Sequence, residues 1–191
     1  MTQFAVILAA AGKSTRFDDP FSKKVFATLA GKAVWLHSLD RFVDRPDVAQ
    51  VIVAIAPEDR EDFMQRFGAN MVVLGFDVVI GGETRAETVE RSLAKVRDDV
   101  EYVAVHDAAR PCISSIWIDK VFAAAREDGA AILASPIVGT VKRVDGDSIV
   151  ETVSRDGLWE AQTPQVFERK LLQDAYAQRG DFQPTDEAQL I

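Results

Sequence analysis

The chain has 191 residues, of which 48% are apolar, and its 22 basic and 30 acidic residues give a formal net charge of −8. This length and composition suit one domain with a buried core and argue against general nucleic-acid binding, which needs clustered cations. A single cysteine, Cys112, excludes an internal disulfide, and no apolar run is long enough to span a bilayer.

Dense apolar runs along the chain predict strands that are buried on both faces. The first of them opens the chain without the basic residues of a signal peptide, so we interpret it as a strand and expect a soluble, cytoplasmic protein. The runs are FAVILAA at 4–10, VIVAIA at 51–56, FDVVI at 76–80, YVAVHD at 102–107 and AILASPIV at 131–138.

Amphipathic stretches between these runs predict helices. They are AVWLHSLDRFVD at 33–44, RAETVERSLAKV at 85–96, SIWIDKVFAAAREDG at 115–129 and FERKLLQDAYAQRG at 167–180. Ser115 is a plausible N-cap for the third, which ends at Gly129. Alternation of strands and helices favours an α/β fold with a mostly parallel sheet and helices on both faces, and ligands then collect at the carboxyl ends of the strands.

Residues 139–155 change the pattern. GTVKRVDGDSIVETVSR alternates apolar and polar residues around Asp145-Gly146, and such a dipeptide between alternating runs is a strong hairpin signal. We expect a β-hairpin arm that projects from the domain.

The first strand leads into GKST, which resembles part of a nucleotide-binding P-loop. A P-loop needs a glycine five residues before Gly12, where this chain has Ile7. The G-x-G-x-x-G fingerprint fails as well, because only one glycine is present. What remains is a small-residue loop whose amides can cradle phosphates, followed by Arg16, Lys23 and Lys24. The alternative is an ordinary turn with solvated basic residues.

Two further strand ends carry candidate chemistry. VAVHDAARP ends a strand at Asp107, where one carboxylate could bind Mg²⁺ together with substrate phosphates; the alternative is a cap or turn residue. We interpret His106 as a buried, hydrogen-bonded histidine. GGETRAETV at 81–89 could bind a base or phosphate through its amides and threonine hydroxyls, and Thr84 with Glu87 also matches a capping box.

In DGLWEAQTPQVF, Trp159 and Phe167 are predicted core residues. Thr163-Pro164-Gln165 is either a rigid turn or a pocket wall, and spacing alone leaves both open.

Taken in order along the whole chain, AAAGKSTRF, SKKVF, GGETRAETV, VHDAARP, GTVKR, VSRDGLWEAQTPQVF and TDEA resemble the 2-C-methyl-D-erythritol 4-phosphate cytidylyltransferase family. The resemblance implies a Rossmann-like, three-layer αβα nucleotidyltransferase fold, here one domain over 1–191 with the arm 139–155 inserted. It implies transfer of CMP from CTP to methylerythritol phosphate with Mg²⁺, in a homodimer joined by the arms. The family usually continues further, so we expect its C-terminal part to be missing here.

The resemblance also implies roles for individual residues. The catalytic cations would be Arg16 and Lys24, with the KVF motif favouring Lys24 over Lys23. Residues implied at the nucleotide are Ala10, Ala11, Gly12, Gly82, Glu83, Arg85 and Thr88. Residues implied at the methylerythritol phosphate are Asp107, Arg110, Thr140, Arg155, Thr163 and Thr185. Asp107 would also meet the metal, and Thr140 and Lys142 would reach the partner's site.

Two alternative functions stay open at this point. A related enzyme could use the same chemistry on ribitol 5-phosphate. An inactive nucleotide-binding scaffold would bind CTP without forming product.

Overall fold

The central sheet is built around β1 (Phe4–Ala9), whose side chains alternate between two apolar clusters. The computed structural model describes residues 3–12 and 23–191. Among these residues, six strands form one sheet. In spatial order they are β5 (Asp77–Ile80), β4 (Val48–Ile55), β1, β6 (Tyr102–Asp107), β10 (Trp159–Glu168) and β7 (Ala130–Pro136).

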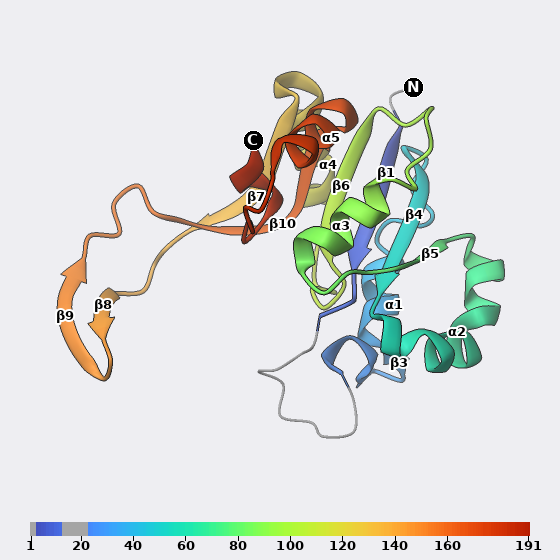
Figure 1. Cartoon of the computed structure of the whole chain (residues 1–191), viewed down its shortest axis with the longest axis horizontal. Coiled ribbons are helices and arrows are strands. Elements are labelled where there is room, and N and C mark those ends of the chain that lie inside the picture. The colour runs from blue at the N-terminus through green and yellow to red at the C-terminus, as the bar shows by residue number, and fades with distance from the viewer. Residues whose placement is uncertain (1–2, 13–22) are drawn as a thin grey trace.

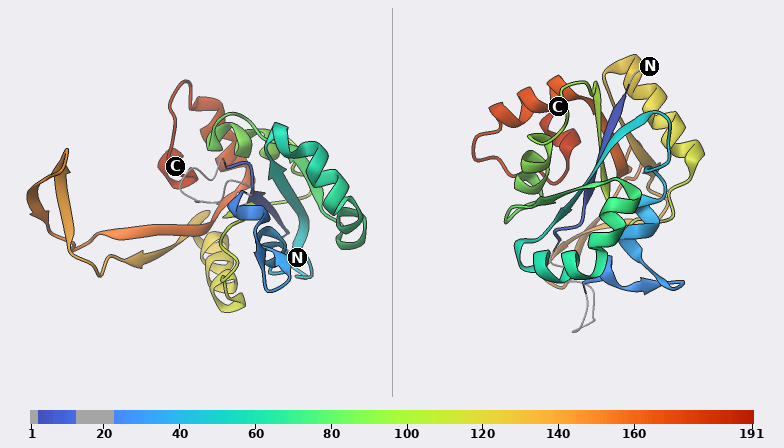
Figure 2. Two further views of the ribbon diagram at one scale, coloured as in Figure 1. Left: turned by 90° about the horizontal axis from the view of Figure 1, so that it is seen from below. Right: turned by 90° about the vertical axis from the view of Figure 1, so that its right-hand side faces the viewer.

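Most of the sheet is parallel. β1 pairs in parallel with β4 and β6, and β4 with β5, whereas β10 runs antiparallel to β6 and β7. Helices cover both faces (Figures 1 and 2). One face packs against α1 (Val34–Leu39), α2 (Arg60–Leu74) and α4 (Ser115–Asp128), and the other against α3 (Arg85–Leu93) and α5 (Arg169–Gln178). The predicted three-layer α/β fold is confirmed, and none of the described helices is long and apolar enough to cross a membrane.

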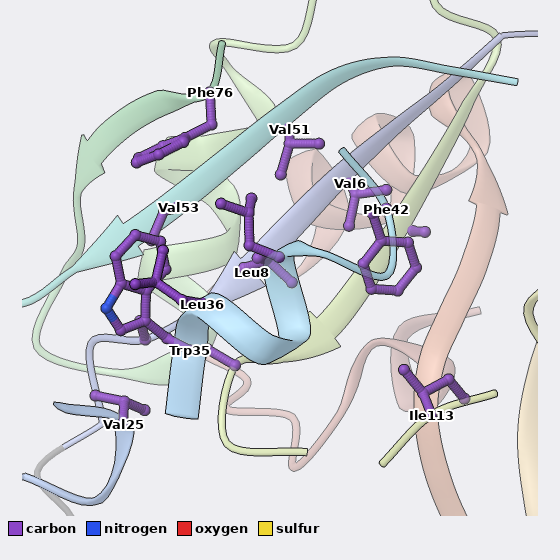
Figure 3. Packing of buried hydrophobic residues seen from close by; sticks show 14 of the residues in the cluster. Val6, Leu8, Val25, Trp35, Leu36, Phe42, Val51, Val53, Phe76 and Ile113 are labelled. Carbon is purple, nitrogen blue, oxygen red and sulfur yellow. The ribbon is translucent and has the colours of Figure 1, made fainter. Parts of the chain in front are cut away.

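The larger cluster includes Val25 and Phe26 from the short helix that begins at Lys24 (Figure 3 shows Val25). Trp35 is fully buried and lies among Phe63, Phe67 and Phe76, with ring centroids 5.0, 5.1 and 5.5 Å apart. Phe26 packs on the same group, 6.2 Å from Phe63. The core therefore fixes the short helix that begins at Lys24. The short elements are η1 (Lys24–Phe26), β2 (Thr28–Leu29), β3 (Lys32–Ala33), η2 (Pro57–Asp59) and η3 (Glu187–Leu190).

The arm forms as predicted. β8 (Val141–Asp145) and β9 (Ser148–Val153) make a separate two-stranded sheet that projects away from the main sheet (Figure 1). Gly146 has φ 54°, in the left-handed region that a tight hairpin turn requires.

Several sequence predictions differ from the structure. The first helix ends at Leu39, because residues 40–45 continue in tighter turns, such as Phe42 N–H to the Leu39 carbonyl, before Pro46. The N-cap of α4 is Ser114, one residue before the predicted cap. Trp159 is 61% exposed and not a core residue, because it lies on the part of β10 that leads to the arm, whereas Phe167 is buried as predicted.

Candidate active site

The carboxyl ends of four parallel strands meet at one edge of the sheet. Ala9 at the end of β1 aligns with Ala54 of β4 and with Asp107 of β6. The amide of Gly81, just after β5, donates to the carbonyl of Ile55 at 2.8 Å. Within this sheet, β4 and β5 lie on one side of β1, and β6, which follows them in the chain, lies on the other. In open α/β sheets ligands bind at this point of reversal.

The Gly81-Gly82 turn packs directly against the loop after β1. A Cβ on Gly81 would lie 2.9 Å from the Ala11 methyl and 2.7 Å from the Thr88 hydroxyl. A Cβ on Gly82 would lie 2.3 Å from the Cβ of Glu87. The glycines therefore allow the two proposed nucleotide-binding loops and the start of α3 to approach closely.

Hydrogen bonds from α3 shape this turn. The Thr88 hydroxyl accepts from the Gly82 amide at 3.1 Å and donates to the Thr84 carbonyl at 2.9 Å. Thr84 caps α3 by accepting from the Glu87 amide at 3.1 Å, as predicted. The Glu87 carboxylate, however, accepts from the Glu83 amide at 2.9 Å. A capping box would aim that carboxylate at Thr84, so the predicted second bond is shifted by one residue.

Asp107 lies between two arginines. Its Oδ2 accepts from Arg110 Nε at 2.9 Å, and its Oδ1 is 3.6 Å from Arg85 Nη2. Arg110 also donates to the side chain of Gln162 on β10. Burial disfavours the charged form of the Arg85 guanidinium, yet the carboxylates of Glu187 and Asp107 raise the pKa of Arg85 above its usual value. Arg85 therefore points to the end of β6 and keeps its charge there.

His106 is buried and fully hydrogen-bonded, which confirms its sequence interpretation. Its Nε2 is 3.1 Å from the Arg110 carbonyl, which can only accept, so Nε2 carries the proton. Nδ1 then accepts a hydrogen bond from the hydroxyl of Thr163, whose Oγ1 is 3.0 Å away. The same Oγ1 accepts the Asp107 amide at 3.2 Å. His106 and Thr163 thus fix the backbone that carries Asp107.

The protein is expected to lose stability as the pH falls through the range where His106 would titrate. Burial lowers the pKa of His106 from 6.5 to about 4. Protons therefore bind the unfolded chain first, and the contribution of the neutral histidine, complete above pH 6.5, is lost towards about pH 4. Between about pH 7 and pH 5 this amounts to about 2 kcal/mol. Urea unfolding without divalent cations measures it.

The control is His106→Asn, which does not titrate. We expect the free energy of unfolding of this variant to fall less over the same pH interval, by about the stated amount. Equal pH dependence of the two proteins would contradict the assignment.

The segment 185–190 is held beside this site by the buried side chains of Gln165 and Glu187, whose contacts were not predicted from the sequence. Gln165 is 1% exposed; its amide donates to Asp186 at 2.8 Å and its oxygen accepts from the Ala188 amide at 3.1 Å. Glu187 is fully buried and accepts from Arg85 at 2.5 Å. Burial raises the pKa of Glu187 above its usual value, and Arg85 opposes this rise. Thr185 of the predicted substrate set begins this segment and is exposed.

Other predicted residues lie apart from this cluster. Thr140 and Arg155 flank the arm, where Arg155 donates to the Val138 carbonyl. Lys142, on the arm itself, donates to Thr152 at 2.6 Å. The arm extends away from the sheet (Figure 1), so the single chain does not bring these residues to Asp107.

Of the two predicted catalytic cations, the structure describes only Lys24. Ala10, Ala11 and Gly12 follow β1 directly, and the Ala10 amide donates to the Ala54 carbonyl at 2.8 Å. Lys24 begins η1, whereas Arg16 lies outside the described residues.

Known proteins that are similar in sequence and in structure show the family to which this chain belongs. Residues 4–191 match the family model "IspD: 2-C-methyl-D-erythritol 4-phosphate cytidylyltransferase". The chain belongs to this cytidylyltransferase family. The enzyme of that name from Rhodopirellula baltica is 41% identical over 98% of this chain and 81% of its own length. The solved structure of the Francisella tularensis enzyme gives a TM-score of 0.80 at 30% identity, covering 99% of this chain and 85% of that one.

A second solved structure supports the same conclusion for the fold. The cytidylyltransferase from Thermus thermophilus gives a TM-score of 0.78 at 30% identity, covering 100% of this chain and 83% of that one. The chain is therefore a cytidylyltransferase by family over almost its whole length.

Within this cytidylyltransferase, Gly82→Ala is expected to weaken CTP binding. The added methyl would lie 2.3 Å from the Cβ of Glu87, so the turn or the start of α3 must shift. We expect a loss of about 1–3 kcal/mol of stability and a rise of about tenfold in the KM for CTP, which corresponds to about 1.4 kcal/mol of binding. Steady-state kinetics and urea unfolding measure the two effects.

Gly68→Ala in α2 is the matched control, because nothing lies within 4 Å of a Cβ added there. It should stabilise the protein by about 0.5–1 kcal/mol and leave the KM unchanged. An unchanged KM in Gly82→Ala would contradict a nucleotide role for the turn.

Proposed function

We propose that this enzyme transfers the cytidylyl group of CTP to the phosphate of 2-C-methyl-D-erythritol 4-phosphate, forming the CDP-alcohol and pyrophosphate. The observation that carries the proposal is the convergence at the carboxyl edge of the sheet. There Ala11 packs on the Gly81-Gly82 turn, and Asp107 lies between Arg85 and Arg110. CTP as the nucleotide supports the cytoplasm as the location.

In the proposed reaction a phosphate oxygen of the acceptor attacks the α-phosphorus of CTP in line. The new P–O bond forms as the bond to the β-phosphate breaks, and pyrophosphate leaves with its electron pair. No covalent enzyme intermediate is needed, so the protein acts by positioning and charge stabilisation. We assign Arg16 and Lys24 to neutralise charge that develops around the α-phosphate.

The nucleotide would lie on the loops after β1 and β5. Backbone groups of Ala10, Ala11, Gly12, Gly82 and Glu83 would face it. Thr88 would act by shaping the turn, because its hydroxyl is already bonded to Gly82 and Thr84.

The described residues fit a magnesium ion that is bound mainly by the triphosphate. No cluster of three or more acidic, histidine or cysteine side chains occurs among the residues that the structure describes. Asp107 offers one carboxylate at the strand end, and Mg²⁺ typically takes one or two carboxylates together with substrate phosphates. When bound there, Mg²⁺ would supply charge neutralisation for the departing pyrophosphate.

The acceptor would be held from both the sheet edge and a partner's arm. On the sheet edge, Arg110 and Thr185 would contact the acceptor, whereas Thr163 would act by positioning Asp107, because its hydroxyl is already bonded to His106 and to the Asp107 amide. Residues Thr140 and Arg155 flank the arm, and with Lys142 we propose that they act across a homodimer. Exposed apolar residues on the arm support this pairing: Val144, Ile149 and Val150 are 59%, 65% and 60% exposed.

Pyrophosphate release from the purified protein tests the proposal. With CTP, Mg²⁺ and methylerythritol phosphate we expect turnover and the CDP-alcohol as product. Arms with ribitol 5-phosphate as acceptor, and with ATP or UTP as donor, should be much slower. A preference for ribitol phosphate would change the acceptor, and CTP binding by calorimetry without product would indicate an inactive scaffold.

A further inference from the structure

A buried carboxylate outside the substrate-facing set connects to Asp107 through one arginine. Glu187, on η3, is fully buried, and its Oε1 lies 2.5 Å from Arg85 Nη1. The other end of the same guanidinium, Nη2, lies 3.6 Å from Asp107 Oδ1. Arg85 thus bridges a buried anion and the anion at the end of β6.

The two contacts of Arg85 differ in length, and the shorter one is to Glu187. At 2.5 Å the Glu187 contact is a close, charge-assisted hydrogen bond, whereas 3.6 Å is beyond normal hydrogen-bond length. Asp107 accepts its own short bond at Oδ2, from Arg110. Asp107 Oδ1 therefore lies near the positive charge of Arg85 but does not accept a hydrogen bond from it.

We propose that Glu187 is a positioning residue for cytidylyl transfer, which holds Arg85 back so that Asp107 Oδ1 stays available to the substrates. This inference rests on the proposed function. Without the Glu187 charge, the guanidinium has one carboxylate left to pair with, and that is Asp107. Full pairing there would occupy the oxygen that the reaction needs.

Neighbouring contacts allow the charge to be removed while the segment stays in place. Gln165 holds the residues on both sides of Glu187, at Asp186 and Ala188. The Tyr176 hydroxyl donates to the same Glu187 Oε1 at 3.2 Å. Glu187→Gln keeps the side-chain size and that acceptor oxygen, whereas Tyr176→Phe removes a neutral hydrogen bond and leaves both charges.

The test compares these variants in the pyrophosphate assay. We expect Glu187→Gln to lower kcat about tenfold or more, as removal of an outer partner of a site ligand typically does. The KM for CTP should change by less than about twofold, because the turn after β5 is not altered. Tyr176→Phe, the matched control, should keep kcat within about twofold of wild type.

A double-mutant cycle separates positioning from a purely structural role. If Glu187 acts through Arg85, then Glu187→Gln lowers kcat no further in an Arg85→Gln background. Additive losses would overturn the proposal, as would a wild-type kcat in Glu187→Gln.

If Glu187→Gln does not fold, Glu187→Asp replaces it in the cycle, because it keeps the charge and withdraws it from Arg85. A lowered kcat that disappears in the Arg85→Gln background supports the proposal, and an unchanged kcat overturns it. Wild-type protein without turnover overturns the proposed function and this inference together, whereas an active wild type with an unimpaired Glu187 variant overturns only the inference.

Discussion

Asp107→Asn is expected to slow pyrophosphate release by about 10²–10³-fold, the loss typical when one group that stabilises charge in the transition state is removed. The amide keeps the shape of the side chain but has no negative charge to offer a cation, and it releases Arg85 and Arg110 from their common partner. The backbone should stay in place, because the Asp107 amide is held by Thr163 independently of the side chain. Steady-state rates at saturating CTP measure the effect.

Asp119→Asn is the matched control for this substitution. Asp119 is also an arginine-paired carboxylate, 2.8 Å from Arg45, but it is 61% exposed and lies on α4. Exposed ion pairs contribute about 0–1 kcal/mol, so stability should change little and kcat should stay at the wild-type value. A kcat for Asp107→Asn equal to that of the control would remove Asp107 from the reaction.

The centre of the sheet was predictable from sequence because the strands β1, β4 and β6 are largely buried and appear as continuous apolar runs. The edge strands β5 and β7 also overlap predicted runs, but they are only partly buried, so the expected burial on both faces is wrong for them. Strand β10 was not predicted, since Pro164 within a run argues against a central strand. In the structure the pairing with β7 shifts register between Ala161 and Gln165, so the proline does not have to donate to that ladder.

Helix α2 was missed for a different reason. Val72 and Val73 are 79% and 80% exposed, so apolar residues stand on the solvent side and obscure the helical period. Its buried anchors, Phe63 and Phe67, are four residues apart, and the same face continues only in the partly buried Met71 and Leu74. Propensity would have helped, because residues 60–74 contain no proline and end at Gly75, which has φ 69°.

In the candidate site, too, some residues were predictable from local sequence and others were not. Groups at strand ends, such as Asp107 and the Gly81-Gly82 turn, were found because a strand end predicts its own location. The pairing of Arg85 with Glu187 was not predicted, because 102 residues separate them and the packing of η3 beside α3 and α5 brings them together. The TDEA motif pointed to this segment, but the inward direction of Glu187 has no signal in the local pattern.

The adjacent lysines provide the second large expected effect. Lys24→Ala should lower kcat by about 10²–10³-fold if its ammonium stabilises charge near the α-phosphate. Lys24 is exposed at the start of η1, so its side chain is accessible to a ligand. The next two residues, Val25 and Phe26, are 5% and 7% exposed and fix that helix on the core. Lys23→Ala is the comparison, made one residue away.

Lys23 forms ion pairs with two carboxylates of η2. Its ammonium lies 2.8 Å from Glu58 and 2.7 Å from Asp59 on η2. Burial disfavours its charge, but hydrogen bonds to Asp59 and Glu58 raise the pKa of Lys23 above its usual value. Lys23→Ala should therefore cost about 1 kcal/mol of stability, as for other partly exposed ion pairs, and leave kcat within about threefold of wild type. Loss of kcat in Lys23→Ala with a normal rate in Lys24→Ala would reverse the assignment, because the catalytic cation would then be the one that η2 holds.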